Sequence, residues 1–331
     1  MTEIPGLALA PNWTSAAGAL EGILAHLGQP LPRHAIMGLT GHAWHFCLAS
    51  RGGVVALPSG PADLNRAALP DRYARTGFRW ERYSGRLVPG ATDQPARAGA
   101  IEWAAARLDA GRPLIGWDFH LHEHAIVYGY SRDRAGFFVH DILTEEVGPF
   151  VPWDAWPSSL GEVELLAPAE PVEVDPVEAV AAALQTALDC FDGRDGPGDG
   201  QPRGTAGIEA WAAAFDGDTE VDRAGNAYTL AVLQAARMDG ADFLADLAAG
   251  IPELSAPAQR AERLLREVVK ALSPLITLFP FPTGGHGNVG NPGLRRGAAM
   301  ALNRAARYER EAAASIAEAL ALRVLSRTLC R

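Results

Sequence analysis

The spacing of apolar residues divides the chain into two parts with different predicted secondary structure. Up to about residue 168, short apolar runs alternate with turns, which is typical of β-strands joined by loops. Beyond residue 176, apolar positions recur at helical spacing within alanine-rich and leucine-rich stretches. The proline-rich and acidic segment 169–176 is predicted to be a linker. Asp175 is expected to be the N-cap of the helix that follows, with Pro176 at its first position.

In the first part, the pattern predicts a mixture of helices and strands. Helices are expected at 15–27, 32–38, 95–110 and, in short form, within 61–76. Strands are expected at 43–48, 53–57, 77–83, 113–117, 124–130, 137–141 and 162–167. The turn-forming residues 131–136 predict a hairpin between two of these strands. The fold class expected for this part is α+β, with an antiparallel sheet.

The second part is predicted to be all-α. Helices are expected near 176–191, 205–215, 224–248, 256–276, 292–304 and 305–327. A long glycine-rich loop, 280–293, separates two of them, and loops of this length are often functional. The predicted organisation is a first domain of 1–168, a linker of 169–176 and a helical domain of 177–331.

Composition and charge exclude several function classes. The net charge is −10 and basic residues form no cluster, so nucleic acid is not expected as a partner. No apolar run reaches the length of a membrane span, and the N-terminus has no pattern of a signal peptide, so we expect a cytoplasmic protein without membrane contact. The three cysteines, Cys47, Cys190 and Cys330, are far apart in the sequence and odd in number. They predict neither a disulfide framework nor a zinc cluster, and we expect no metal and no cofactor.

The first candidate for chemistry is Ser15, at the start of the predicted helix 15–27. A nucleophile at a helix N-terminus lies at the positive end of the helix dipole, beside backbone N–H groups that can stabilise an oxyanion. The alternative is that Thr14 or Ser15 serves only as the N-cap of the helix.

A row of histidines precedes the most apolar predicted strand. His120, His122 and His124 alternate with other residues, so an extended segment would place all three on one face and could bind a metal. His124 opens the strand and Asp141 ends its predicted hairpin partner, which predicts that the two lie side by side. Ser15, His124 and Asp141 would then form a nucleophile, base and orienting carboxylate.

Several short motifs occur in an order that resembles a known family. The chain is similar to bacterial papain-like domains of the C39 peptidase type and to the BtrH-type N-terminal domain of butirosin biosynthesis, over roughly residues 5–168. The helical second part, with GIEAW at 207–211 and LFPFP at 278–282, resembles the helical domain that often accompanies BtrH-type domains. The motifs of the first part are SAAGALEGIL at 15–24, GLTGHAWHF at 38–46, GRPLI at 111–115, HAIVYGY at 124–130 and VHD at 139–141.

The resemblance implies a papain-like fold and acyl-transfer chemistry in specialised metabolism, by a hydrolase, acyltransferase or cyclase. The substrate would be a small, peptide-like or carrier-bound acyl compound. The family carries cysteine where this chain has Ser15, and a hydroxyl needs active deprotonation to attack. Two alternatives stay open: a degenerate ligand-binding or partner-binding protein, and a metal-dependent enzyme at His120, His122 and His124.

Other residues are candidates for supporting roles. Leu9 stands where papain-like enzymes place an oxyanion-hole glutamine, so Asn12 is the nearest amide that could replace it. Asp118 could polarise the histidine row or bind a substrate amine. The candidates for contact with substrate lie in different parts of the chain: Trp13, His42, Trp44, His122 and His286.

Overall fold

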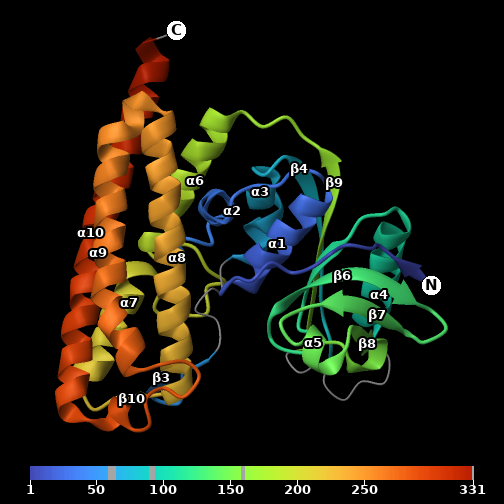
Figure 1. Cartoon of the computed structure of the whole chain (residues 1–331), viewed down its shortest axis with the longest axis horizontal. Helices are drawn as coiled ribbons and strands as arrows, with labels where there is room; N and C mark the ends of the chain where they lie inside the picture. The colour runs from blue at the N-terminus through green and yellow to red at the C-terminus, as the bar shows by residue number, and fades with distance from the viewer. Residues whose placement is uncertain (59–64, 89–93, 158–160, 330–331) are drawn as a thin grey trace. The chain divides into compact units, whose positions relative to one another are not determined.

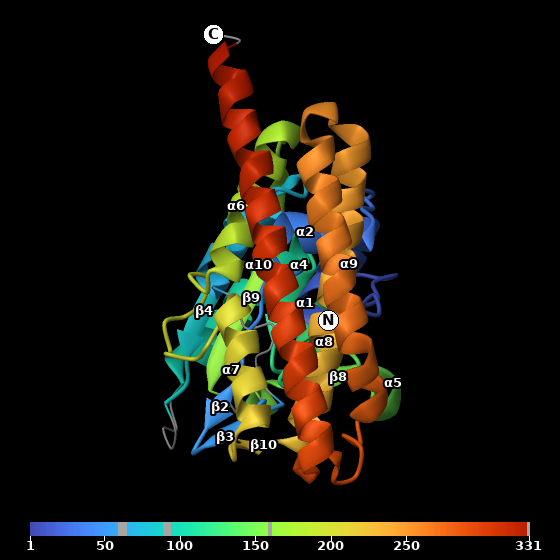
Figure 2. The ribbon, with the colours of Figure 1, turned by 90° about the vertical axis from the view of Figure 1, so that its left-hand side faces the viewer.

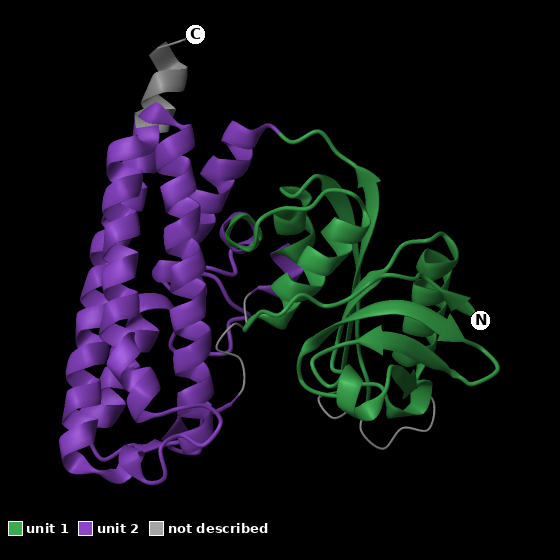
Figure 3. Cartoon of the chain, viewed as in Figure 1, with its two compact units in different colours: residues 1–36, 69–174 green, residues 37–68, 175–331 purple. Residues whose placement is uncertain are grey.

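The computed structural model describes residues 1–58, 65–88, 94–157 and 161–329. The chain forms two compact units (Figure 3): unit 1 comprises residues 1–36 and 69–174, and unit 2 comprises residues 37–68 and 175–331. This division differs from the predicted boundary at 168 in one main respect, because the segment 37–68 belongs with the helical unit. Cys330 falls outside the described residues.

Unit 1 is built on a seven-stranded sheet whose described pairings are all antiparallel, which confirms the α+β class (Figure 1). The strand order is β4-β9-β5-β6-β7-β8, and β1 also pairs with β6. The strands are β1 (Thr2–Glu3), β4 (Phe78–Arg86), β5 (Leu114–Trp117), β6 (His124–Ser131), β7 (Gly136–His140), β8 (Phe150–Pro152) and β9 (Glu162–Pro171). The predicted strands at 113–117, 124–130 and 137–141 therefore form the middle of the sheet.

Helices cover both faces of this sheet. Helix α1 lies close to β6, because a Cβ at its Gly22 would meet the side chain of Ile126 at 2.9 Å. Helix α4 lies on the opposite face, where the Tyr83 hydroxyl donates to the carbonyl of Ala96 at 3.0 Å. The helices are α1 (Ser15–His26), α3 (Leu69–Ala74), α4 (Pro95–Asp109), α5 (Thr144–Val147) and the 3-10 turn η2 (Trp153–Ala155), while α2 (Arg33–Thr40) spans the junction between the two units.

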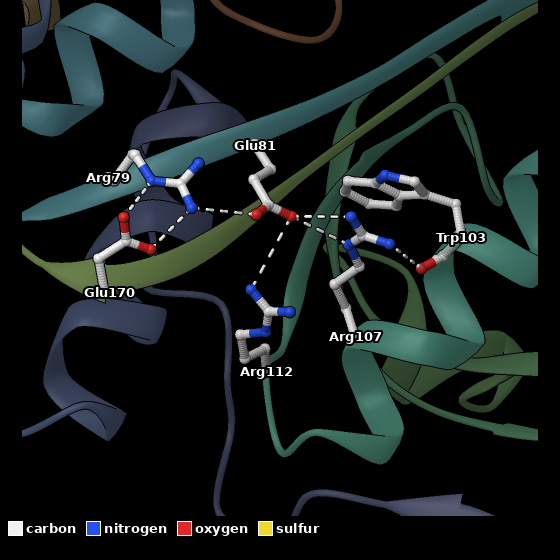
Figure 4. Close-up of polar contacts among 6 residues, drawn as sticks. All are labelled: Arg79, Glu81, Trp103, Arg107, Arg112 and Glu170. Carbon is white, nitrogen blue, oxygen red and sulfur yellow. Dashed lines mark hydrogen bonds and ion pairs between the residues drawn. The ribbon is translucent and has the colours of Figure 1, made fainter.

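Ion pairs connect α4 to the β4–β9 edge of unit 1 (Figure 4). The Glu81 carboxylate on β4 accepts from Arg107 of α4 at 2.8 and 3.1 Å. Arg79 donates to Glu81 at 3.3 Å and to Glu170 on β9 at 2.7 Å. The hydrogen bond from Arg107 lowers the pKa of Glu81, and the one from Arg79 lowers the pKa of Glu170 to about 2. Both carboxylates are therefore charged at neutral pH.

Unit 2 consists mainly of helices, of which α8, α9 and α10 pack side by side (Figure 2). The helices are α6 (Pro176–Phe191), α7 (Gly204–Asp216), α8 (Arg223–Gly250), α9 (Ser255–Leu278) and α10 (Pro292–Leu329), with the 3-10 turns η1 (Arg66–Ala68), η3 (Pro252–Leu254) and η4 (Asn288–Gly290). The two helices predicted at 292–304 and 305–327 are one continuous helix, because neither glycine nor proline occurs between residue 298 and the end of α10. As predicted, the Asp175 side chain caps α6 by accepting from two backbone N–H groups.

Unit 2 also contains a small three-stranded sheet. The prediction that the C-terminal part is all-α is therefore wrong in this detail. The sheet consists of β2 (Ser50–Arg51), β3 (Val54–Val55) and β10 (Glu220–Val221). β3 pairs in antiparallel fashion with β2 and in parallel with β10. The sheet joins the segment 37–68 to the loop before α8.

Aromatic packing holds the segment 37–68 within the core of unit 2. The Trp44 ring is fully buried and lies 6.1 Å from the ring of Phe191 and 6.0 Å from that of Phe243. Its Nε1 donates to the carbonyl of Gly38 at 3.0 Å. Gly38 is required here, because a Cβ would lie 2.3 Å from the Phe243 ring.

A buried ion pair completes this attachment. Arg237 of α8 pairs with Glu309 of α10, and both side chains are fully buried. The same guanidinium donates to the carbonyls of Ala43 at 2.8 Å and His45 at 3.3 Å. One arginine therefore joins two helices and the loop after α2.

Among the described residues, no helix combines the length and the apolar character needed to cross a lipid bilayer.

Candidate active site

Ser15 is the first residue of α1, and its hydroxyl does not cap the helix. Thr14 occupies the N-cap position with extended backbone angles, and its side chain makes no capping hydrogen bond. The Ser15 Oγ instead donates to Glu123 Oε2 at 2.5 Å and accepts from the backbone N–H of His124 at 3.0 Å. Ser15 is 5% exposed. The capping alternative therefore holds for the position of Thr14 but not for Ser15, and Ser15 Oγ is directed towards the loop that precedes β6.

That loop, residues 118–123, places the Glu123 carboxylate beside Ser15. The backbone of Asp118 has a positive φ of 63°, and its N–H donates to the carbonyl of Glu123 at 3.0 Å, which closes the loop. The indole Nε1 of Trp156 donates to the Trp117 carbonyl at 2.9 Å and fixes the end of β5. The fully buried Asp118 thus sits at the turn itself.

His124 lies at the start of β6, as predicted, and on the face of the sheet that α1 covers. It pairs in register with Trp117, and the two rings are 4.9 Å apart in an edge-on arrangement. Side chains alternate between faces along a strand, so His124 and Ile126 share the face on which Gly22 of α1 packs. Ser15 and the His124 side chain therefore lie at the same end of the sheet and on the same face of it.

The predicted pairing of Asp141 with His124 is wrong. Asp141 Oδ2 lies 2.8 Å from Nδ1 of His120 instead. The register pairs Ile126 with His140, so position 124 lies opposite position 142, and an irregularity between residues 127 and 129 shifts the hairpin. Because a shift of one residue exchanges the faces of a strand, Asp141 is on the other side from His124.

His120 and Asp141 form a well-supported imidazole–carboxylate pair. The His120 side chain is 15% exposed and that of Asp141 is 4% exposed. Asp141 Oδ1 also accepts from the Leu143 N–H at 2.9 Å and from the Thr144 hydroxyl at 3.1 Å. A carboxylate held in this way fixes the orientation and the tautomer of its histidine. Nδ1 then carries the proton that faces Asp141, and Nε2 is the nitrogen that can accept one.

The histidine row does not gather around one centre. His120 pairs with Asp141, and His124 stacks on Trp117. His122 is half exposed, with its Nε2 3.8 Å from Asp118 Oδ1. The segment is a closed loop and not an extended strand, so the alternation that predicted a shared face does not apply. In the parts of the chain that the structure describes, these three side chains do not form a metal-ligand group.

Asn12 offers a donor close to Ser15. Its Oδ1 accepts from the backbone N–H of Thr14 at 2.9 Å. Its Nδ2 is buried and has no hydrogen-bond partner among the described residues. Leaving a buried donor unpaired costs about 1–3 kcal/mol, so such a group is expected to find a partner in a ligand or in water. Trp13, between them in sequence, is 41% exposed.

The other predicted substrate contacts belong to unit 2. His42 is 3% exposed, and the contacts of Trp44 make it a core residue of that unit. His286 is exposed in the glycine-rich loop and has a positive φ of 42°. In the described part of unit 2, these three residues form no common site.

Sequence reasoning missed three residues of the site. Glu123 lies within the histidine row and was not predicted as a site residue, although its carboxylate accepts the hydrogen bond from Ser15. His140 accepts at Nδ1 from the N–H of Leu9 at 3.2 Å and so holds the segment that leads to α1. The Thr144 hydroxyl accepts a hydrogen bond from the Asp141 N–H at 2.7 Å. The spacing of Asp141 and Thr144 could have indicated this turn, in which a side chain bonds to the backbone.

Comparison with known proteins adds no assignment. No protein-family model matches the chain, and no curated protein is significantly similar to it. What the fold contributes is an antiparallel α+β unit in which the first residue of a helix meets the start of a central strand. The papain-like resemblance stays a prediction, and the functional argument depends on the site itself.

Proposed function

We propose that unit 1 carries out acyl transfer or acyl hydrolysis on a small, peptide-like or carrier-bound substrate, with Ser15 as nucleophile. The observation that carries the proposal is the hydrogen bond of 2.5 Å from Ser15 Oγ to the Glu123 carboxylate. A serine hydroxyl is a weak nucleophile until an adjacent base accepts its proton, and Glu123 is placed to do so. In this proposal Ser15 is the nucleophile, as predicted, and Glu123 takes the role of base that was predicted for His124.

The reaction would proceed through an acyl-enzyme. Ser15 Oγ bonds to the acyl carbon as its proton passes to Glu123, and Glu123 returns that proton to the leaving group. An incoming water, alcohol or amine then gives a proton to Glu123, attacks the acyl carbon and releases Ser15, which regains the proton. This cycle needs no co-reactant beyond the acyl acceptor.

The start of α1 supplies the stabilising donors for this chemistry. Backbone N–H groups at the start of a helix lack the usual carbonyl acceptor four residues earlier, and the dipole of the helix favours negative charge there. In α1 the Ala17 N–H already donates to the Thr14 carbonyl at 3.0 Å, so the candidate donors are the N–H groups that precede it. Asn12 Nδ2, which has no hydrogen-bond partner among the described residues, is a further donor three residues before Ser15. One lost oxyanion donor costs roughly 3–4 kcal/mol of transition-state stabilisation.

A fluorophosphonate probe tests the nucleophile. Wild type is expected to be labelled, Ser15→Ala not at all, and Glu123→Gln about 10²–10⁴-fold more slowly, the usual contribution of a positioned base. Ser131→Ala is the matched control, since Ser131 is also buried in unit 1 and its Oγ accepts from a backbone N–H. An unlabelled wild type that also turns over no acyl substrate would overturn the proposal.

A second comparison separates the two candidate bases. His124, on the same face and at the same end of the sheet as Ser15, is a second group able to accept a proton. His124→Gln is expected to slow labelling less than Glu123→Gln does. The reverse order would assign the base to His124, as the sequence predicted, and leave Glu123 with a positioning role.

One observation favours a ligand-binding protein as the second candidate. The Ser15 hydroxyl both donates and accepts within the protein, to Glu123 and from the His124 N–H, as structural serines do. In that case Ser15→Ala would retain binding of the acyl compound in calorimetry while wild type shows neither labelling nor turnover. Ser15→Cys, treated with a thiol probe, reports whether an attacking group at this position can be reached.

A further inference from the structure

Unit 2 contains a cluster of three potential metal ligands that the sequence keeps far apart. His45 follows α2, Cys190 lies in the last turn of α6, and Asp195 lies in the loop after α6. Their ligand atoms all lie within 4.8 Å of one another, and among the described residues they are the one such group of three or more. All three residues are buried, with exposures of 4%, 1% and 4%.

Two of the three distances within this cluster match those between ligands of a single ion. His45 Nδ1 is 3.5 Å from Asp195 Oδ2, and Cys190 Sγ is also 3.5 Å from that oxygen. Bonds of about 2.0–2.3 Å to a tetrahedral zinc ion hold the ligand atoms roughly 3.3–3.8 Å apart. A direct imidazole–carboxylate hydrogen bond is shorter, as the 2.8 Å between His120 and Asp141 in unit 1 shows.

The chemistry and charge of the three groups also fit a divalent transition metal. A thiolate, a neutral imidazole and a carboxylate are the three ligand types that zinc takes in proteins. With Cys190 as a thiolate, the three groups carry two negative charges, which a divalent ion balances. Without an ion, Cys190 as a neutral thiol donates to Asp195 Oδ2 at 3.5 Å.

We propose that His45, Cys190 and Asp195 bind one zinc ion in unit 2. With three protein ligands, the fourth position would be taken by water. The ion would connect the loop after α2 to the end of α6, and so hold the segment 37–68 against the helical part of the same unit. The proposal revises the expectation that the widely spaced cysteines bind no metal, and it is independent of the chemistry proposed for Ser15.

The competing account is a buried polar network without an ion. Arg203 supplies a positive charge close by, because a Cβ at Gly196, the residue after Asp195, would lie 2.4 Å from Arg203 Nε. Arg203 also pairs with Asp199 at 2.8 Å. This guanidinium could balance Asp195 alone, whereas a bound metal would engage Cys190 as a thiolate.

Metal analysis of the full-length protein, prepared without a polyhistidine tag, tests the proposal. We expect about one equivalent of zinc per chain in wild type and its loss in Cys190→Ala and His45→Gln. Cys47→Ala is the matched control, because Cys47 is another buried cysteine of unit 2 outside any disulfide, and it should keep the zinc. A wild type that binds no zinc, or a Cys190→Ala protein that retains it, would overturn the proposal.

Cobalt substitution gives an answer even if the variants fail to fold. Wild-type protein stripped of metal with a chelator and titrated with Co²⁺ should develop a thiolate-to-metal charge-transfer band that saturates at one equivalent. Zinc should then displace the band. A titration without this band would show that Cys190 ligates no metal and would refute the site.

Discussion

The buried pair of Arg237 and Glu309 allows a quantitative test of how unit 2 holds the segment 37–68. Replacing Glu309 by Gln leaves a guanidinium uncompensated in a fully buried position. Removing one partner of a buried ion pair typically costs about 3–5 kcal/mol. Because Arg237 keeps its bonds to two carbonyls, we expect Glu309→Gln to fall near 3 kcal/mol.

Replacing Arg237 should be more destabilising than replacing Glu309. Arg237→Met leaves Glu309 uncompensated and also deprives the carbonyls of Ala43 and His45 of their donor. Each orphaned carbonyl adds about 1 kcal/mol or more, so the total should exceed 5 kcal/mol. The double variant Arg237→Met/Glu309→Met buries no charge and should recover part of this loss, ending about 2–4 kcal/mol below wild type. Arg237 Nη2 and Glu309 Oε2 already lack hydrogen-bond partners among the described residues. Because the double variant removes these two buried polar atoms, it should regain part of the lost stability.

Hydrogen exchange measured by mass spectrometry is the suitable assay, because a chain with two units need not unfold in one step. Peptides from α8 and α10 report on unit 2, and peptides from α1 serve as the internal control. The order of stability expected is wild type, then the double variant and Glu309→Gln, and last Arg237→Met. A double variant as stable as wild type would show that the carbonyl bonds contribute nothing. Equal losses in the two single variants would lead to the same conclusion.

Three further predictions concern local features. Gly38→Ala should destabilise unit 2 by about 1–3 kcal/mol, because its Cβ would lie 2.3 Å from the Phe243 ring, and hydrogen exchange in the peptides of unit 2 measures this. Asp175→Ala removes the acceptor for two N–H groups of α6 and should cost about 1 kcal/mol by the same assay, whereas Asp175→Asn should cost less. The pKa of Glu170 is lowered to about 2 in the folded state by Arg79, so its stabilisation is present above the unfolded pKa and is lost as pH falls towards 2. The stability difference between wild type and Arg79→Ala should therefore shrink between about pH 5 and pH 2, and a constant difference would contradict the assignment.

The sequence predicted the elements of this protein better than it predicted their contacts. Helix α6 begins at the predicted residue because an aspartate N-cap and a proline at the first position are local signals. The hairpin of β6 and β7 was likewise found from its turn residues. Its register was not, because the irregularity between residues 127 and 129 depends on packing and leaves no clear mark in the sequence.

The candidate site shows the same division. Ser15 at the start of α1 and His124 at the start of β6 followed from helix and strand patterns. The contacts of Glu123 with Ser15 and of His120 with Asp141 could not be predicted. They depend on the loop 118–123, which turns at Asp118, a residue with positive φ that is not glycine. The grouping of His45 with Cys190 depends on the fold of unit 2, and spacing along the chain gives no indication of it.

The order of the two units along the chain has a consequence for synthesis on the ribosome. The segment 37–68 is made early but belongs to unit 2, whose remaining residues, 175–331, are made after all of unit 1. Trp44, which is fully buried in the finished protein, must wait as an exposed side chain until Phe191 and Phe243 have been synthesised. Nascent chains stalled before residue 175 would present this segment to chaperones, so binding of a holdase should fall once α8 has left the ribosome tunnel. For the same reason, expression of residues 175–331 alone should give an aggregating product unless residues 37–68 are supplied as a second chain.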